Sequence, residues 1–263
     1  MKTTTIFLIL LLLYSCRESS HNKKYILYPD STNFEYKLVK PDLLKVIRFF
    51  PGTKDTSQIF FHNINSRHKD SVEYYYDRNG NIKLTTEFQD SLMNKYIIKK
   101  YRKDGTPKLS VQFENNEPKI KHYYYPSGKL KILRNFIKVD NRISINGEIH
   151  YFENGDINID STLYADLKCN KDTVSIGDSI VCKFDVLMPA EMKYKIITGK
   201  LDENFNPIGN PKKLTKIKYD KFILKPNKTG KNTYRFIVIY SPEDEKIKKT
   251  GYFLLKKEIL VTK

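Results

Sequence analysis

Tryptophan is absent from this 263-residue chain, and cysteine occurs only three times. So few cysteines exclude a disulfide-dense small scaffold and a zinc array built from several cysteines. Glycine and proline, at 11 residues each, are too scarce for a collagen-like or low-complexity chain. Outside residues 6–13 no segment is apolar enough to supply the roughly 20 residues that a membrane-spanning helix needs. The apolar fraction of 40% is nevertheless sufficient for a packed core.

Acidic residues are outnumbered, with 30 of them against 47 basic residues and a net charge of +17. A large positive charge is typical of many nucleic-acid-binding proteins. Here the excess is mostly lysine, it is spread along the chain, and it contains no arginine cluster. We therefore interpret it as a solvated lysine surface and predict no nucleic-acid partner.

The motifs of common catalytic sites are missing as well. The chain has no P-loop, no dinucleotide-binding glycine motif, no G-x-S-x-G and no H-E-x-x-H. Residues 177–180 resemble the nucleophile block of GDSL-type hydrolases, but all five histidines precede them, so the downstream histidine base of that family is lacking. We predict a non-enzymatic protein with no catalytic residue, no metal site and no cofactor. Paired carboxylates for glycoside hydrolysis stay open as an alternative.

The first 16 residues have the pattern of a secretory leader. One lysine precedes the apolar run at residues 6–13, and Cys16 follows shortly after it. Residues 13–16, LYSC, resemble the lipobox of bacterial lipoproteins. That resemblance implies a signal peptide over residues 1–15, acylation of Cys16 and attachment to a membrane, and Arg17 in the next position points to the outer membrane. The alternative is an ordinary secretory leader in which Cys16 is incidental. Residues 16–40 are polar and predict a tether that ends in a first edge strand.

Residues 41–165 contain an internal repeat. Gly80, Gly105, Gly128 and Gly155 are 25, 23 and 27 residues apart, and each follows Asn, Asp or Ser. The repeated segments are YYYDRNGNIK at 74–83, YRKDGTPK at 101–108, YYYPSGKLK at 123–131 and HYFENGDIN at 150–158. Each one predicts a β-hairpin, because glycine accepts the positive φ that such turns require. Stacked in series, the hairpins can cover one another's apolar faces.

These segments resemble variant MORN-type repeats, which occur in bacterial envelope proteins and in an antitoxin-like family. The resemblance implies a β-rich scaffold without a catalytic centre. A candidate binding surface is formed by the repeated tyrosines, since flat apolar rings can bind sugars or lipid headgroups; these are Tyr74, Tyr75, Tyr76, Tyr123, Tyr124 and Tyr125. The competing interpretation places the same rings in the stacked core, because aromatic residues at alternating positions of a strand are usually buried there.

Residues 166–263 predict a separate β-sandwich. Apolar and β-branched runs at 179–186, 193–201, 214–224, 233–241 and 251–262 are separated by turn residues. Residues 172–180 resemble the start of bacterial Ig-like domains, although the core tryptophan of that fold is lacking. Cys169 and Cys182 both fall at inward-facing positions of their predicted strands. A secreted protein can join them in a disulfide, and two buried free thiols fit the sequence equally well.

The sequence as a whole predicts an all-β fold, in which an array of β-hairpin repeats is followed by a small Ig-like β-sandwich. The predicted ranges are 1–15 for the signal peptide, 16–40 for the tether, 41–165 for the repeats and 166–263 for the sandwich. Asp-Ser/Thr triplets at residues 70, 90, 160, 172 and 178 resemble O-glycosylation acceptors of periplasmic Bacteroidetes proteins. We expect a membrane-anchored envelope lipoprotein that acts as a scaffold or binds protein or glycan. An antitoxin or immunity-like repeat protein that neutralises a toxin is the alternative.

Overall fold

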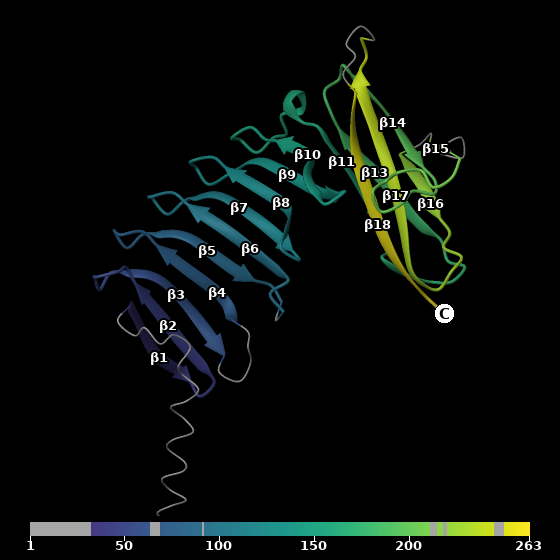
Figure 1. Cartoon of the computed structure of the whole chain (residues 1–263). Coiled ribbons are helices and arrows are strands. Elements are labelled where there is room, and N and C mark those ends of the chain that lie inside the picture. Colours follow the sequence, from purple (N-terminus) through teal and green to yellow (C-terminus); the bar gives the residue numbers. More distant parts are fainter. Residues whose placement is uncertain (1–32, 64–68, 91, 211–214, 218–219, 245–249) are drawn as a thin grey trace, which may run out of the picture. The chain divides into compact units, whose positions relative to one another are not determined.

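The computed structural model of the chain describes residues 33–63, 69–90, 92–210, 215–217, 220–244 and 250–263. The predicted leader, the lipidation site Cys16 and most of the predicted tether lie outside these residues. Within them the named regular elements are β-strands and a short 3₁₀ turn, η2, at Ile159–Ser161 (Figure 1). The predicted all-β fold class is confirmed. In the described ranges no helix has the length and apolar character that crossing a membrane requires.

The first ten strands form one antiparallel sheet in which their order equals their order in the sequence. They are β1 (Phe34–Lys40), β2 (Leu43–Phe49), β3 (Thr56–Asn63), β4 (Lys69–Tyr76), β5 (Ile82–Phe88), β6 (Lys95–Tyr101), β7 (Pro107–Glu114), β8 (Glu117–Tyr124), β9 (Leu130–Val139) and β10 (Arg142–His150). The predicted turn at Gly80 joins β4 to β5, and the turn at Gly128 joins β8 to β9. An array of consecutive hairpins is therefore the architecture of this sheet.

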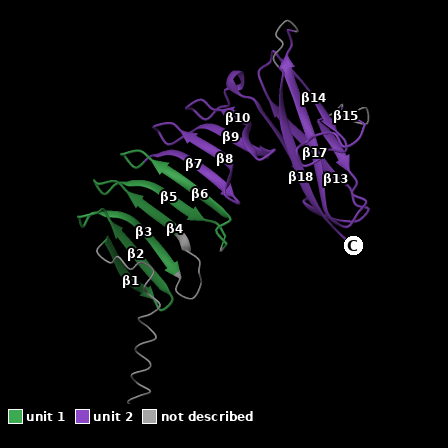
Figure 2. Cartoon of the chain, in the orientation of Figure 1, with its two compact units in different colours: residues 1–105 green, residues 106–263 purple. Residues whose placement is uncertain are grey.

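The chain divides into two compact units, residues 1–105 and residues 106–263 (Figure 2). The first unit holds β1 to β6 and has a small buried cluster of Leu44, Val46 and Phe60. The second unit holds β7 to β10 together with all the strands of the sandwich. This division falls inside the range predicted for the repeats, and the first sandwich strand begins at Tyr164, next to the predicted 165/166 boundary.

Two small sheets share one core in the second unit. A three-stranded sheet has the order β11-β13-β16, and a five-stranded sheet has the order β12-β18-β17-β14-β15, with β12 parallel to β18. The rings of Phe184, Phe222 and Phe236 meet across the two sheets with centroids 5.0 to 5.3 Å apart. This is the arrangement of an Ig-like sandwich. The strands are β11 (Tyr164–Cys169), β12 (Thr173–Ser175), β13 (Ile180–Leu187), β14 (Met192–Thr198), β15 (Thr215–Ile217), β16 (Lys221–Leu224), β17 (Gly230–Pro242) and β18 (Gly251–Thr262).

One predicted strand of the sandwich is wrong. The apolar run at residues 214–224 predicts a single strand, but it contains β15 and β16, which belong to different sheets. Two adjacent charged residues, Asp220 and Lys221, interrupt the apolar positions of this run, but the sequence does not show that its two ends belong to different sheets. The partner strands determine which sheet each half of the run joins, because β15 pairs with β14 and β16 pairs with β13.

Within the second unit, the last hairpin of the array packs on the sandwich. Ile137 and Val139 of β9 contact a cluster formed by Leu201, Phe205 and Leu254. The β-bulge of β10 lies between Ile145 and Gly147, and the residue at the bulge, Asn146, turns its amide to β18. Its Nδ2 donates to the Leu254 carbonyl and its Oδ1 accepts from the Leu254 N–H, both at 2.8 Å. The side chain thus replaces a neighbouring strand along this part of the β18 edge.

Candidate binding grooves between the hairpin turns

The turn between β4 and β5 is held by one carboxylate. Asp77 Oδ1 accepts the N–H groups of Asn79 and Asn81 at 2.9 and 3.0 Å, and Gly80 adopts a φ of +81°. The Asp77 N–H donates to the Asn81 carbonyl, which closes the turn. These donors, with Asn81 the largest contributor, hold the pKa of Asp77 below its ordinary value, so the carboxylate stays charged and keeps the turn in place.

The other repeats build the same turn from different residues. The glycine N–H donates back to the carbonyl three residues earlier at Gly80, Gly105, Gly128 and Gly155. In every repeat a tyrosine stands four residues before the glycine, and these tyrosines are Tyr76, Tyr101, Tyr124 and Tyr151. A shared turn therefore places an aromatic ring at the same point of each hairpin.

The first groove lies in the first unit, between two neighbouring turns. It has a volume of about 490 Å³, and its lining includes Lys54 and Asp55 from one turn and Arg78, Asn79 and Gly80 from the next. Tyr76 supplies the aromatic wall. Burial is the largest cause that raises the pKa of the Tyr76 hydroxyl, which therefore stays protonated and able to donate.

The second groove is the next one along the array, also about 490 Å³ in volume. Two tyrosines line it, Tyr74 from β4 and Tyr101 from the end of β6. The Tyr101 hydroxyl lies 3.3 Å from Oγ1 of the buried Thr85, which fixes the ring. Glu87 also lines the groove, and its Oε1 accepts from Lys99 Nζ at 2.7 Å. The groove thus combines aromatic faces with a carboxylate and a hydroxyl.

Both grooves open on one face of the sheet. Ile59, which lines the first groove, is the cross-strand partner of Tyr74, which lines the second. Tyr75 points the other way, because side chains alternate along a strand. Its hydroxyl donates to Oε2 of the buried Glu73 at 2.8 Å. Of the three predicted tyrosines of this repeat, two line grooves and one has a packing role.

The predicted tyrosines of the third repeat are engaged with their own neighbours in the second unit. Two cations lie over the ring of Tyr123, with Lys121 Nζ at 4.7 Å and Arg134 Cζ at 5.4 Å from its centroid. The Tyr124 hydroxyl is 3.2 Å from Ser110 Oγ. The Tyr125 hydroxyl donates to the Tyr151 carbonyl at 2.8 Å, and Lys131 lies over its ring. Within the first unit Tyr75 thus faces away from Tyr74 and Tyr76, and within the second unit each of the three tyrosines contacts a group of its own.

Several groove residues are missing from the sequence-based set. Tyr101 could have been found, because it has the same position relative to Gly105 as Tyr76 has relative to Gly80. Thr85 and Glu87 carry no comparable signal, since their place in a groove depends on the pairing of β4 with β5 and of β5 with β6. Among the described residues no group of three or more His, Cys, Asp or Glu side chains is placed to hold a metal ion.

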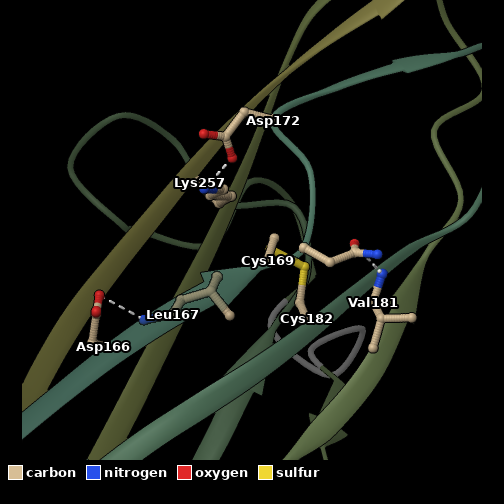
Figure 3. The surroundings of a disulfide bond; sticks show 8 residues. Asp166, Leu167, Cys169, Asp172, Val181, Cys182 and Lys257 are labelled. Atoms are coloured by element: carbon tan, nitrogen blue, oxygen red, sulfur yellow. Dashed lines mark hydrogen bonds and ion pairs between the residues drawn. A yellow bond between two sulfur atoms is a disulfide. The ribbon is translucent and has the colours of Figure 1, made fainter.

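Cys169 and Cys182 form a disulfide that links β11 to β13 (Figure 3). The two residues are direct cross-strand partners, and Cys182 is fully buried in the core of the sandwich. They are 13 residues apart in the chain. Closing a loop of this size restricts the unfolded chain and contributes about 3 kcal/mol to stability. The bond also fixes the register of β11 against β13.

Sequence comparison with known proteins assigns no function to the grooves. No protein-family model matches the chain, and no curated protein is similar to it in sequence. The residues that line the grooves, and their geometry, are therefore the basis for assigning a function.

Proposed function

We propose that the protein is a non-enzymatic, lipid-anchored envelope protein whose hairpin array binds glycan in the grooves between its turns. The observation that carries the proposal is the second groove, where Tyr74 and Tyr101 line the same space as Glu87. A sugar ring offers an apolar face to an aromatic side chain and hydroxyls to carboxylates and amides. The groove supplies both kinds of contact.

The size of the grooves favours a glycan over a protein. Small-ligand sites have volumes of about 300–1,000 Å³, and each groove, at about 490 Å³, falls in that range. A stable protein interface instead needs a broad surface of about 800 Å² on each partner. The tyrosines that would have to form such a surface are divided, since Tyr75 faces away from the grooves and the Tyr123 ring is covered by two cations.

Binding is measured with a panel of oligosaccharides and the purified chain, by calorimetry. Tyr101→Ala and Tyr74→Ala each remove an aromatic wall, and we expect each to weaken binding about fivefold, because an aromatic contact contributes about 1 kcal/mol. Tyr101→Phe keeps the ring and should retain most of the affinity, which separates ring contact from folding. Tyr252→Ala, at a 64% exposed position of β18, is the matched control. Undiminished binding by both alanine variants would refute the site.

The anchor requires its own test, because Cys16 lies outside the described residues. We expect palmitate labelling of the protein in its host and loss of the label with Cys16→Ala. The alternative, an antitoxin-like protein, requires a cytoplasmic chain that keeps Met1 and binds a protein toxin. Recovery of a cytoplasmic chain that keeps Met1, binds a protein toxin and does not bind glycan would refute the proposal and support the antitoxin-like alternative.

A further inference from the structure

Three lysines lie side by side across the outer face of the three-stranded sheet. Lys168 of β11 is the cross-strand partner of Lys183 of β13, and Lys183 is in turn the partner of Lys221 of β16. All three side chains are exposed. Neighbouring strands are about 4.8 Å apart, so the row places three positive charges within roughly 10 Å.

Such a row is unfavourable for the fold. Like charges directly opposite each other on neighbouring strands repel. Asp185 offsets part of this repulsion, because it accepts from Lys168 at 2.7 Å and from Lys183 at 2.9 Å. Within the described residues no ion pair joins Lys221 to an acid. The Cys169–Cys182 disulfide next to the row holds β11 and β13 in the register that keeps the lysines opposite each other.

Exposed aliphatic side chains accompany the lysines. Val181 and Ile223 are cross-strand partners in the next outward-facing row, and their side chains are 39% and 60% exposed. On the other side of the same strands, Cys182 and Phe222 pack in the core. The fold thus leaves an apolar pair in solvent beside three cations. We call these five residues, Lys168, Lys183, Lys221, Val181 and Ile223, the lysine face.

We propose that the lysine face docks on an anionic lipid bilayer, with its cations at the level of the lipid phosphates and Ile223 and Val181 in the interface. Lysines stabilise contact with an anionic leaflet by charge, and their long aliphatic stems let the ammonium groups reach the headgroups while the apolar pair enters. Charge and apolar surface together are the combination that peripheral membrane binding uses. This docking requires neither acylation of Cys16 nor glycan binding.

The test exploits the absence of tryptophan from the chain. Ile223→Trp places a single indole on the lysine face, and Tyr252→Trp places one at a 64% exposed position of the five-stranded sheet. Each full-length variant is mixed with vesicles of brominated phosphatidylcholine, with or without phosphatidylglycerol. We expect bromine quenching of the Ile223→Trp fluorescence in the vesicles that contain phosphatidylglycerol and much weaker quenching for Tyr252→Trp.

Charge removal then tests the lysines themselves. Lys168→Gln, Lys183→Gln and Lys221→Gln together, in the Ile223→Trp chain, should lower the partition coefficient about 100-fold, because each lysine near an anionic surface contributes about fivefold. The control is the same change at three exposed lysines of the five-stranded sheet, Lys195, Lys216 and Lys256, which should cost less than tenfold. Thermal unfolding of each variant confirms that the sandwich is intact.

Specific results would overturn the proposal. Equal quenching of both indoles, or no quenching in any vesicle, would show that the lysine face does not meet the bilayer. If the two sets of lysine substitutions lower the partition coefficient equally, binding depends on the net charge of the protein and not on the lysine face. Binding of soluble polyglutamate in preference to the vesicles would assign the face to an acidic polypeptide.

Discussion

The contact between Asn146 and Leu254 gives a sharp prediction about how the hairpin array is attached to the sandwich. Asn146→Ala removes an amide that donates to the Leu254 carbonyl and accepts from its N–H. Leu254 is only 8% exposed, so water does not readily replace the lost partners. A buried backbone group without a partner costs about 1–3 kcal/mol, and we expect a local loss of about 2 kcal/mol.

Hydrogen exchange at the Leu254 amide measures this loss directly. A loss of about 2 kcal/mol corresponds to exchange that is about 30-fold faster. Asn146→Asp is more informative than alanine, because a carboxylate still accepts from the N–H but places negative charge against the carbonyl. We expect the N–H to stay protected to an intermediate degree while global stability falls.

The matched control is Asn154→Ala, which removes an exposed turn amide that bonds only to its neighbour Asp156. Exchange at Leu254 should not change in that variant. If Asn146→Ala leaves the exchange rate at Leu254 unaltered, the Asn146 amide does not protect the Leu254 backbone as a paired strand would. The contacts of Ile137 and Val139 with the sandwich then suffice to hold the hairpin.

Three other predictions follow from packing, titration and the disulfide. Gly251→Ala would press a methyl group against Cζ and the hydroxyl of Tyr240, whose ring is stacked on Phe253, so we expect a loss of about 1–3 kcal/mol in urea unfolding. Burial lowers the pKa of His122 below 6.5, which means that the unfolded state binds the proton more tightly; stability should therefore fall as the pH drops below about 6.5, and His122→Gln should flatten that dependence. Cys182→Ala should lower the free energy of unfolding by about 3 kcal/mol or more, with dithiothreitol producing a similar loss in the natural chain.

Much of the architecture could be predicted because its signals are local. A glycine after Asn, Asp or Ser between aromatic and alternating segments fixes a hairpin without reference to any other part of the chain. The strand predicted at residues 251–262 has the same bounds as β18. Inward positions of β13 were also readable, since Ile180, Cys182 and Phe184 alternate with exposed residues and are buried.

The parts that could not be predicted depend on pairing between distant strands. The second groove needs Thr85 and Tyr101, which come together only through the register of β5 with β6. The lysine row needs β11, β13 and β16 in fixed registers, and nothing in the segments around Lys168 or Lys221 indicates that they share a face. The sequence indicates which residues alternate within one strand, but the packing of the core determines which strands pair.

A turn in the sandwich shares its carboxylate with the turn between β4 and β5 but has no glycine. Asp202 accepts the N–H groups of Asn204 and Asn206, as Asp77 does in the array, but the glycine position holds Phe205 with a φ of +63°. A left-handed backbone costs a residue with a side chain about 1–2 kcal/mol. Burial of the Phe205 ring in the cluster that receives the last hairpin contributes about 2–3 kcal/mol and offsets that cost. The carboxylate is therefore the feature these two turns share. Glycine is one way to relieve the backbone, and a buried ring at the junction of array and sandwich is another.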